Sequence, residues 1–422
     1  MISLTTPVRH GRAVVALCLA VAATACQGAA TDNPSQPTAS SPAPTVATAQ
    51  ISITPATGSS QVKPGAGVTV QVTDGSITSV TAKGGSDQLT GRMTASVWRS
   101  RQTLHTGTRY TIRATAVDAS GKTVTAISSF RTLRPSNTVR AVIFEAAGQT
   151  YGVGMPIFLS FDHPIVNKRA VERALEVRSS TPVVGAWYWD GDSTVEFRPR
   201  SYWPANTTVH FVGHLDGVEV APGVYGAHTL TQKFKIGRSL IAVGSTVTHH
   251  IQIYLNKRLL GNWPMSSGKP GDDTPNGTYL TIEKANPVEM KGPGYDIMVP
   301  FSVRFTWSGD YLHDAYWSVG QQGYSNVSHG CVNLSPANAE TYYNLSVPGD
   351  PVTISGSPRG GAWGNGWTVW FLSWRELLHG SATHNAVRAG PSGSRFVRPS
   401  TLRAGYRTPP LQAPAKGNSE PA

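Results

Sequence analysis

The 422-residue sequence predicts a mainly β protein made of several strand-rich units, and two observations carry that prediction. Only 14% of the residues are charged, while 43 glycines and 30 prolines accompany a hydrophobic fraction of 39%. Thr, Ser and Val also recur in short runs that alternate between polar and apolar residues, as half-buried strands do. A chain of this length suggests about two to four domains, each with its own core.

Residues 1–26 predict an export signal that does not belong to the fold. Basic residues between positions 9 and 12 precede a short apolar run, and small residues at 23–25 precede Cys26. This order is typical of a cleaved signal peptide. Cys26 directly after it suggests lipid attachment, although Ala23 replaces the larger aliphatic residue of a typical lipobox. We therefore expect a lipoprotein or a simply cleaved protein outside the cytoplasmic membrane.

Two strand-rich modules follow a linker. Residues 27–50 are mostly Thr, Ser, Pro and Ala, which predicts a disordered linker. Residues 51–136 and 137–237 each have the length and strand spacing of an immunoglobulin-like β-sandwich, without its cysteine pair. Hairpins are predicted around 118–121 and 190–193, where turn residues separate alternating runs.

A third strand-rich unit spans residues 238–356. It contains a predicted short helix over 337–345, with Ser335 as its N-cap and Pro336 at its first position. Residues 357–380 hold a Trp-rich segment that predicts a helical flap packed on the third unit. Residues 381–422 are rich in Arg, Pro and Ser and predict a disordered basic tail.

The net charge of +12 admits several kinds of anionic partner. No RNP, zinc-finger or helix-turn-helix pattern accompanies the charge, so we expect no nucleic acid. A solvated basic surface and attraction to an anionic envelope polymer both stay open.

The cysteine content singles out Cys331. The sequence has cysteines only at 18, 26 and 331, and the first two belong to the predicted signal. A thiol needs a nearby base or cation to become a nucleophile, and His313 and His329 are both close in sequence. Gly330 permits unusual dihedrals, and backbone N–H groups there could cradle an oxyanion. A buried structural cysteine and a zinc site are the alternatives, although no CxxC or HxxxH pattern supports zinc.

The complete motif is more specific than its parts. Fourteen residues separate His313 from Ser328, which begins the run Ser-His-Gly-Cys-Val-Asn at 328–333. This pattern closely resembles the signature of the L,D-transpeptidase family. The turns at 266–269 and 274–277 look like blocks of that family that lie upstream of the histidine. The resemblance covers about 240–355, and the modules around it are similar to those of mycobacterial members.

The resemblance implies a role for each matched residue. Cys331 matches the acylated nucleophile, and His313 matches the general base. The backbone carbonyl of Asp314 would orient that histidine, but relatives often have Ser or Gly there, and the charge could raise the histidine pKa. His329 and Gly330, with Cys331 itself, are candidate oxyanion N–H donors.

The resemblance also implies a set of substrate-contacting residues, which are Met290, Tyr295, Ser308, Gly309, Trp317, Ser328 and Asn333. Met290 and Tyr295 resemble a short lid over the donor pocket. The structural alternatives are a loop anchor for Asn333, a core position for Trp317 and a hairpin turn at 308–309. A calcium site is not supported, because the segment 217–223 lacks the second acidic residue, and we expect no metal or other cofactor.

The implied reaction is a two-step acyl transfer on peptidoglycan. A donor tetrapeptide would acylate Cys331 with loss of D-Ala, and the side-chain amine of an acceptor diaminopimelate would then form a third-to-third cross-link. Carbapenems would be inhibitors that acylate the same cysteine. An L,D-carboxypeptidase that trims stems, and a non-enzymatic wall-binding protein, are the alternatives.

Overall fold

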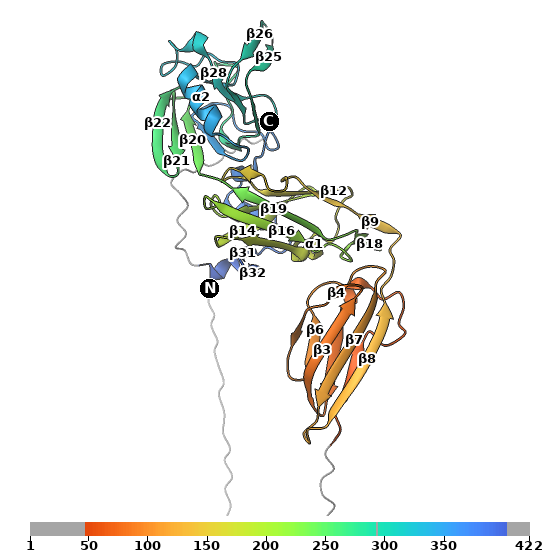
Figure 1. Cartoon of the computed structure of the whole chain (residues 1–422). Helices are drawn as coiled ribbons and strands as arrows, with labels where there is room; N and C mark the ends of the chain where they lie inside the picture. The colour runs from red at the N-terminus through yellow and green to blue at the C-terminus, as the bar shows by residue number, and fades with distance from the viewer. Residues whose placement is uncertain (1–46, 293, 403–422) are drawn as a thin grey trace, which may run out of the picture. The chain divides into compact units, whose positions relative to one another are not determined.

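A computed structural model of the chain describes residues 47–292 and 294–402 (Figure 1). The predicted export signal, Cys26 and most of the predicted linker lie outside these residues. Within the described ranges, no helix is long and apolar enough to cross a membrane. Strands carry the fold throughout, which confirms the predicted mainly β class.

The first module is a sandwich of two four-stranded sheets, ordered β1-β2-β6-β5 and β4-β3-β7-β8. The predicted hairpin at 118–121 joins β7 and β8, and Asp118 closes it by accepting from the amides of Ser120 and Lys122. Alternation sends Tyr110 inward, where its ring stacks on that of Phe130 at 5.5 Å. The elements are β1 (Gln50–Thr54), η1 (Pro64–Ala66), β2 (Thr69–Thr73), β3 (Ser76–Gly84), β4 (Asp87–Gln88), β5 (Gly91–Met93), β6 (Val97–Ser100), β7 (Arg109–Val117) and β8 (Thr123–Arg131).

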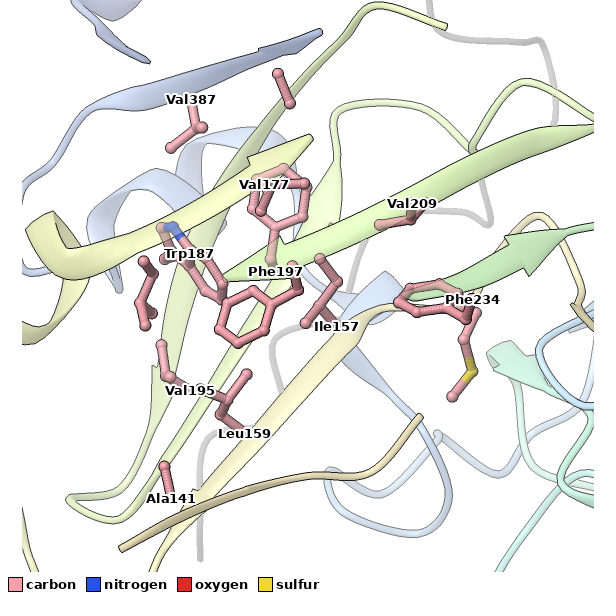
Figure 2. Close-up of a cluster of buried hydrophobic side chains, with 14 of the residues drawn as sticks. Ala141, Ile157, Leu159, Val177, Trp187, Val195, Phe197, Val209, Phe234 and Val387 are labelled. Atoms are coloured by element: carbon pink, nitrogen blue, oxygen red, sulfur yellow. The ribbon is translucent and has the colours of Figure 1, made fainter. Parts of the chain in front are cut away.

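The second module packs a six-stranded sheet, β10-β12-β15-β14-β31-β32, against the four-stranded sheet β11-β19-β16-β13. Its core is aromatic, with Trp187 and Phe197 fully buried between the two sheets (Figure 2). The predicted hairpin at 190–193 joins β14 to β15. The elements are β9 (Asn137–Val139), β10 (Ala141–Ile143), β11 (Thr150–Tyr151), β12 (Ile157–Phe161), α1 (Lys168–Ala174), β13 (Leu175–Ser179), β14 (Val183–Asp190), β15 (Thr194–Pro199), β16 (Thr207–Gly213), β17 (Glu219–Ala221), β18 (Val224–Gly226) and β19 (Leu230–Ile236).

The predicted disordered tail at 381–422 is wrong for its first part. Strands β31 (Ala386–Gly390) and β32 (Gly393–Val397) form a hairpin that extends the large sheet of the second module. The short helix η4 (Pro399–Thr401) follows β32. Val387 enters the core shown in Figure 2. Buried Glu172 of α1 holds the start of this segment, because its carboxylate accepts from Ser381 and from the amides of residues 382 and 383. Residues 403–422 lie outside the described ranges.

The third unit contains the sheets β22-β21-β20-β30-β23 and β24-β27-β28-β29, with a separate hairpin β25-β26. The predicted helix is present as α2, with Pro336 at its first position, although the Ser335 side chain makes no capping bond. The elements are β20 (Leu240–Ser245), β21 (His250–Leu255), β22 (Arg258–Pro264), β23 (Gly277–Leu280), β24 (Glu283–Ala285), β25 (Val288–Gly292), β26 (Tyr295–Val299), β27 (Ser302–Arg304), β28 (Tyr311–Asp314), η2 (Tyr316–Ser318), β29 (Val332–Leu334), α2 (Pro336–Leu345) and β30 (Pro351–Ser355).

The Trp-rich segment at 357–380 contains η3 (Val369–Phe371) and α3 (Trp374–His379). We expected this flap to pack on the third unit, and the Phe371 ring does meet the Tyr279 ring there at 5.0 Å. The rest differs, since Leu377 of α3 is buried with Ala186 of β14 in the second module. Arg198 also donates to the carbonyls of Val369 and Leu372. The segment therefore binds the second module and the third unit together.

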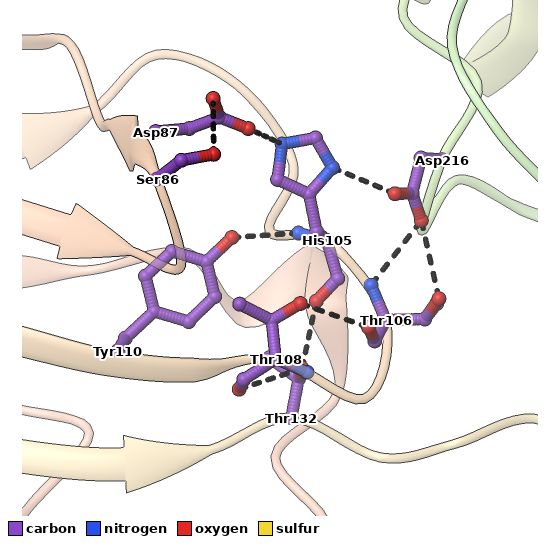
Figure 3. A network of polar contacts seen from close by, with 8 residues as sticks. All are labelled: Ser86, Asp87, His105, Thr106, Thr108, Tyr110, Thr132 and Asp216. Carbon is purple, nitrogen blue, oxygen red and sulfur yellow. Dashed lines mark hydrogen bonds and ion pairs between the residues drawn. The ribbon is translucent and has the colours of Figure 1, made fainter.

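A polar network joins the first module to Asp216 of the second (Figure 3). The Asp216 carboxylate accepts from His105 Nδ1 at 2.7 Å and from the Thr106 amide at 3.2 Å. Asp87 lies on the other side of the ring, 3.6 Å from His105 Nε2. The hydrogen bond with Asp216 is the main cause that raises the pKa of His105, and burial opposes it.

We predict that this junction weakens at alkaline pH. A histidine whose pKa is raised on folding stabilises most below its ordinary pKa of about 6.5, and the contribution is lost as pH rises through the raised value. In Asp216→Asn, histidine NMR should show the His105 pKa falling toward its ordinary value. Asp192→Asn, an exposed acid elsewhere on the second module, is the control and should leave it unchanged. A His105 titration that is the same in both variants would contradict the assignment.

Candidate active site

Two adjacent strands position the candidate nucleophile and base. β28 and β29 are parallel, and His313 lies opposite Asn333 in their register. Cys331 immediately precedes β29. The pairing of the two strands therefore brings the chain at Cys331 beside β28, which carries His313, although the two residues are 18 positions apart in sequence.

Contacts from the upstream turns hold the loop before Cys331. Thr274 Oγ1 donates to the carbonyl of Gly330 at 2.6 Å and accepts from the amide of Gly268 at 2.9 Å. Gly330 has φ +130°, and a Cβ there would lie 2.5 Å from Asp310 Oδ1. The position therefore requires glycine on both conformational and steric grounds.

His313 is held as a neutral base. Its side chain is 4% exposed, and Nδ1 donates to the backbone carbonyl of Asp314 at 2.7 Å. That bond fixes the proton on Nδ1 and leaves Nε2 unprotonated. Burial lowers the pKa of His313 to about 4. The expected rise caused by the Asp314 charge is not found, because burial dominates and also raises the pKa of the Asp314 carboxyl itself.

Cys331 is half-buried, and Sγ lies 3.7 Å from the carbonyl oxygen of Gly309, to which the thiol donates. Burial raises the pKa of the thiol to about 12. With His313 neutral as well, the resting pair is a thiol beside an imidazole rather than an ion pair. A nucleophilic role for this thiol would therefore require a base that takes its proton as the sulfur attacks.

We predict that Cys331 alkylates slowly at neutral pH. A thiol with a pKa near 12 is thiolate in only about one molecule in 10⁵ at pH 7, so the iodoacetamide rate should rise about tenfold per pH unit from 7 to 10. Peptide mass spectrometry measures the modification at Cys331. The same chain in denaturant is the control, where the rate should level off above the ordinary pKa of about 8.5. A folded-state rate that is flat between pH 6 and 8 would instead indicate a thiolate–imidazolium pair.

The candidate oxyanion donors are not equivalent. The Gly330 amide donates to Ser328 Oγ at 3.2 Å, so the expectation of a free donor at Gly330 is not met. Ser328 Oγ in turn donates to the carbonyl of Cys331 at 2.6 Å. Among the described residues, the amides of His329 and Cys331 have no hydrogen-bond acceptor. These two N–H groups are the ones left for an oxyanion.

His329 differs from His313 in its exposure and in its partners. It is exposed, and its Nε2 lies 2.9 Å from the Lys269 ammonium. Because a lysine ammonium can only donate, this nitrogen is the acceptor of the contact. Lys269 also lies 3.3 Å from Asp272. No sequence pattern indicated the lysine contact, since 60 residues separate its two partners.

The predicted lid is the hairpin of β25 and β26. Its Tyr295 ring stacks on the His329 ring with centroids 4.9 Å apart. Met290 pairs with Ile297 across the hairpin. The structure thus brings Tyr295 to the catalytic loop and places Met290 farther along the same hairpin.

The other predicted contact residues differ in their burial and in their partners. Asn333 is buried and donates to Ser318 Oγ at 2.9 Å, as the loop-anchor alternative describes. Trp317 is 46% exposed, and its ring stacks near that of His313 at 6.1 Å, so the alternative of a core position is wrong. The Ser308 hydroxyl donates to buried Asp310 at 3.2 Å, and the Ser308 amide donates to Asn365 Oδ1 at 2.8 Å. Within the described ranges, no cluster of three His, Cys, Asp or Glu residues could hold a metal ion.

Comparison with known proteins identifies two matching families and several relatives. Residues 240–354 match the family described as L,D-transpeptidase catalytic domain, and residues 59–219 match the bacterial Ig domain family. L,D-transpeptidase 5 of Mycobacterium tuberculosis is 34% identical over 352 residues, which are 79% of this chain and 77% of that protein. L,D-transpeptidase 2 of the same species is 30% identical over 68% of this chain and 72% of that protein. A solved L,D-transpeptidase 3 from M. tuberculosis, in complex with a faropenem-derived adduct, is 31% identical, with a TM-score of 0.42 over 51% of this chain and 97% of that chain.

Proposed function

This chain belongs to the L,D-transpeptidase family, and we propose that it forms third-to-third cross-links in peptidoglycan through a thioester on Cys331. The donor is a stem tetrapeptide whose third residue is a diaminopimelate. The acceptor is the side-chain amine of a diaminopimelate in another stem. The chemistry is acyl transfer at a cysteine, with His313 as the base.

The first step forms the acyl-enzyme. Cys331 Sγ attacks the carbonyl carbon of the third stem residue while its proton passes to His313 Nε2. The tetrahedral oxyanion accepts from the amides of His329 and Cys331. The bond to D-Ala then breaks, and His313 returns the proton to the leaving amine. A thioester remains, and no net charge has been created.

The second step reverses the proton path. The acceptor amine attacks the thioester carbonyl, and His313 takes the proton that the amine loses. The carbon–sulfur bond breaks, and His313 returns that proton to the sulfur. An amide cross-link and the free Cys331 thiol are the products.

One observation carries this proposal most directly. Cys331 directly precedes β29, which pairs with the strand of His313, and the Asp314 carbonyl leaves His313 Nε2 available as a base. A neutral imidazole with this tautomer can accept the thiol proton without first losing one of its own. Both partners are therefore in the correct protonation state before substrate binds.

Product analysis tests the proposal. The full chain is incubated with a purified disaccharide-tetrapeptide, with and without an added amine acceptor, and the products are measured by mass spectrometry. Cross-linked dimer and released D-Ala are expected, together with an adduct to the added amine. Tripeptide alone under both conditions would favour the carboxypeptidase alternative. No product and no acyl-enzyme would favour a wall-binding protein without activity.

Carbapenems should act as poor-turnover donors at the same thiol. The Cys331 sulfur can attack the lactam carbonyl and open the ring by breaking its carbon–nitrogen bond. A stable thioester remains. Intact-protein mass spectrometry should detect one adduct per chain, and peptide mapping should place it on Cys331. An adduct elsewhere on the chain would contradict this assignment.

We also propose that the chain is exported and held by lipid at Cys26. The order of basic, apolar and small residues in 1–26 supports export, and Cys26 at its end supports the lipid. Mass spectrometry of the N-terminus from cells separates lipid attachment from cleavage. An intact N-terminus on a cytoplasmic protein would overturn both proposals.

A further inference from the structure

We propose that the first module is an electrostatic tether for polymeric peptidoglycan, with both outer faces of its sandwich binding the carboxylates of stem peptides. This inference rests on the proposed function, because it takes the same polymer as the ligand. It concerns a surface far in sequence from Cys331, and it assigns binding rather than chemistry to that surface.

The positive charge of the folded chain is concentrated in this module. Residues 51–136 contain ten Lys and Arg, three Asp and no Glu, which gives a net charge of +7. Residues 137–237 contain nine basic and nine acidic residues and are neutral, and residues 357–402 contain five basic residues and one acidic residue, for +4. Residues 238–356 contain seven basic and nine acidic residues, for −2. The catalytic unit is therefore not the part of the chain that attracts an anionic polymer.

One outer face is formed by β3, β7 and β8, which Figure 1 shows side by side. Arg109 and Arg131 lie directly opposite each other on β7 and β8, and both are exposed. Lys83 and Arg113 are exposed on the same face by strand alternation, next to threonines of the neighbouring strands. No acidic residue of these strands shares that face.

The opposite sheet repeats the arrangement. Arg92 on β5 lies directly opposite Arg99 on β6, and both are exposed. Thr69 of β2 is the next residue across from Arg99. Arg101 follows β6 and is also exposed. Strands β1, β2, β5 and β6 contain no Asp or Glu.

These cations have no ion-pair partner among residues 47–292 and 294–402. In the described part of the chain, no Lys or Arg of the first module forms an ion pair with a carboxylate. Like charges directly opposite on a sheet destabilise it. Two such arginine pairs, one on each face, weaken the module unless an external anion lies between them. Arginine is well suited to that role, because its planar fork binds a carboxylate through two hydrogen bonds.

The placement of the cations favours a polymer over a membrane. A flat bilayer can contact only one face of a sandwich, whereas a mesh of strands can surround the module and contact both. Threonines between the arginines add hydroxyl groups that can hydrogen-bond a polar polymer. Tethering by the first module would raise the local concentration of stems at the catalytic unit without changing its chemistry.

Pelleting with insoluble peptidoglycan tests the tether. The full chain is mixed with peptidoglycan from which all covalently attached accessory polymers have been removed, over a series of NaCl concentrations. The quadruple variant Arg92→Gln, Arg99→Gln, Arg109→Gln and Arg131→Gln should bind about tenfold more weakly or worse, and its residual binding should depend less on salt. Its melting temperature should be unchanged or higher, because two repulsive pairs are removed.

The second module offers a matched control. Arg388 and Arg395 also lie directly opposite each other and exposed, on β31 and β32, but Glu176 lies beside that hairpin and the module is otherwise balanced. Arg388→Gln with Arg395→Gln removes the same charge and the same repulsion as Arg109→Gln with Arg131→Gln. Binding should fall clearly less in the control pair. An equal loss in both pairs would show that net charge alone matters and would overturn the assigned surface.

The other outcomes are equally decisive. Wild-type binding that does not fall as the salt concentration rises overturns the proposal. The proposal is also overturned if anionic phospholipid vesicles or untreated wall capture the protein while stripped peptidoglycan does not. Turnover of the soluble disaccharide-tetrapeptide should be the same in the quadruple variant and the wild type. Failure of that turnover in the wild type would refute the proposed function, whereas loss of pelleting alone concerns only the tether.

Discussion

Cys331→Ser is expected to abolish turnover of the disaccharide-tetrapeptide and to eliminate the acyl-enzyme. A serine hydroxyl has a much higher pKa than a thiol and a poorer attacking atom. His313, with its pKa lowered to about 4, is too weak a base to compensate for that difference. Release of D-Ala and the mass of the intact protein measure the two effects.

The fold of this variant must be checked, because the site is partly buried. The Ser328 bond to the Cys331 carbonyl and the Thr274 bond to the Gly330 carbonyl both involve backbone and should survive the substitution. Circular dichroism and thermal melting should therefore match the wild type. A folded Cys331→Ser protein that still releases D-Ala at a substantial rate would exclude Cys331 as the nucleophile.

His313→Ala is expected to cut the rate of acylation by about 10²–10⁴, the usual effect of losing a positioned acid–base group. The thiol pKa near 12 makes the loss severe, because little thiolate forms without a base. The losses from Cys331→Ser and His313→Ala should not add, since both residues serve one step. Single-turnover acylation by a carbapenem, followed by mass spectrometry, measures this step alone.

His329→Ala is the matched control for the base. This histidine is exposed, its Nε2 faces the Lys269 ammonium, and the role proposed for it uses a backbone N–H that alanine retains. We expect a milder loss, caused mainly by the removed stack with Tyr295 of the lid. A folded His313→Ala protein with near-normal acylation, beside an inactive His329→Ala protein, would reverse the roles of the two histidines.

The sequence by itself determined the features that depend on local patterns. Polar and apolar alternation around 118–121 and 190–193 predicted two hairpins that the structure contains. Proline at the first turn of a helix predicted where α2 begins. The resemblance of the run from His313 to Asn333 to the family signature pointed to His313 and Cys331, and the strand of His313 lies beside the strand that Cys331 precedes.

Only the tertiary structure decided the features that depend on distant partners. The hairpin of β31 and β32 looked like a disordered tail, because its arginines mask a short apolar alternation that becomes a strand only beside β14. The Lys269–His329 contact joins residues 60 positions apart. The pKa values of His313 and Cys331 follow from burial, which is set by the whole surrounding fold and therefore cannot be obtained from the motif alone.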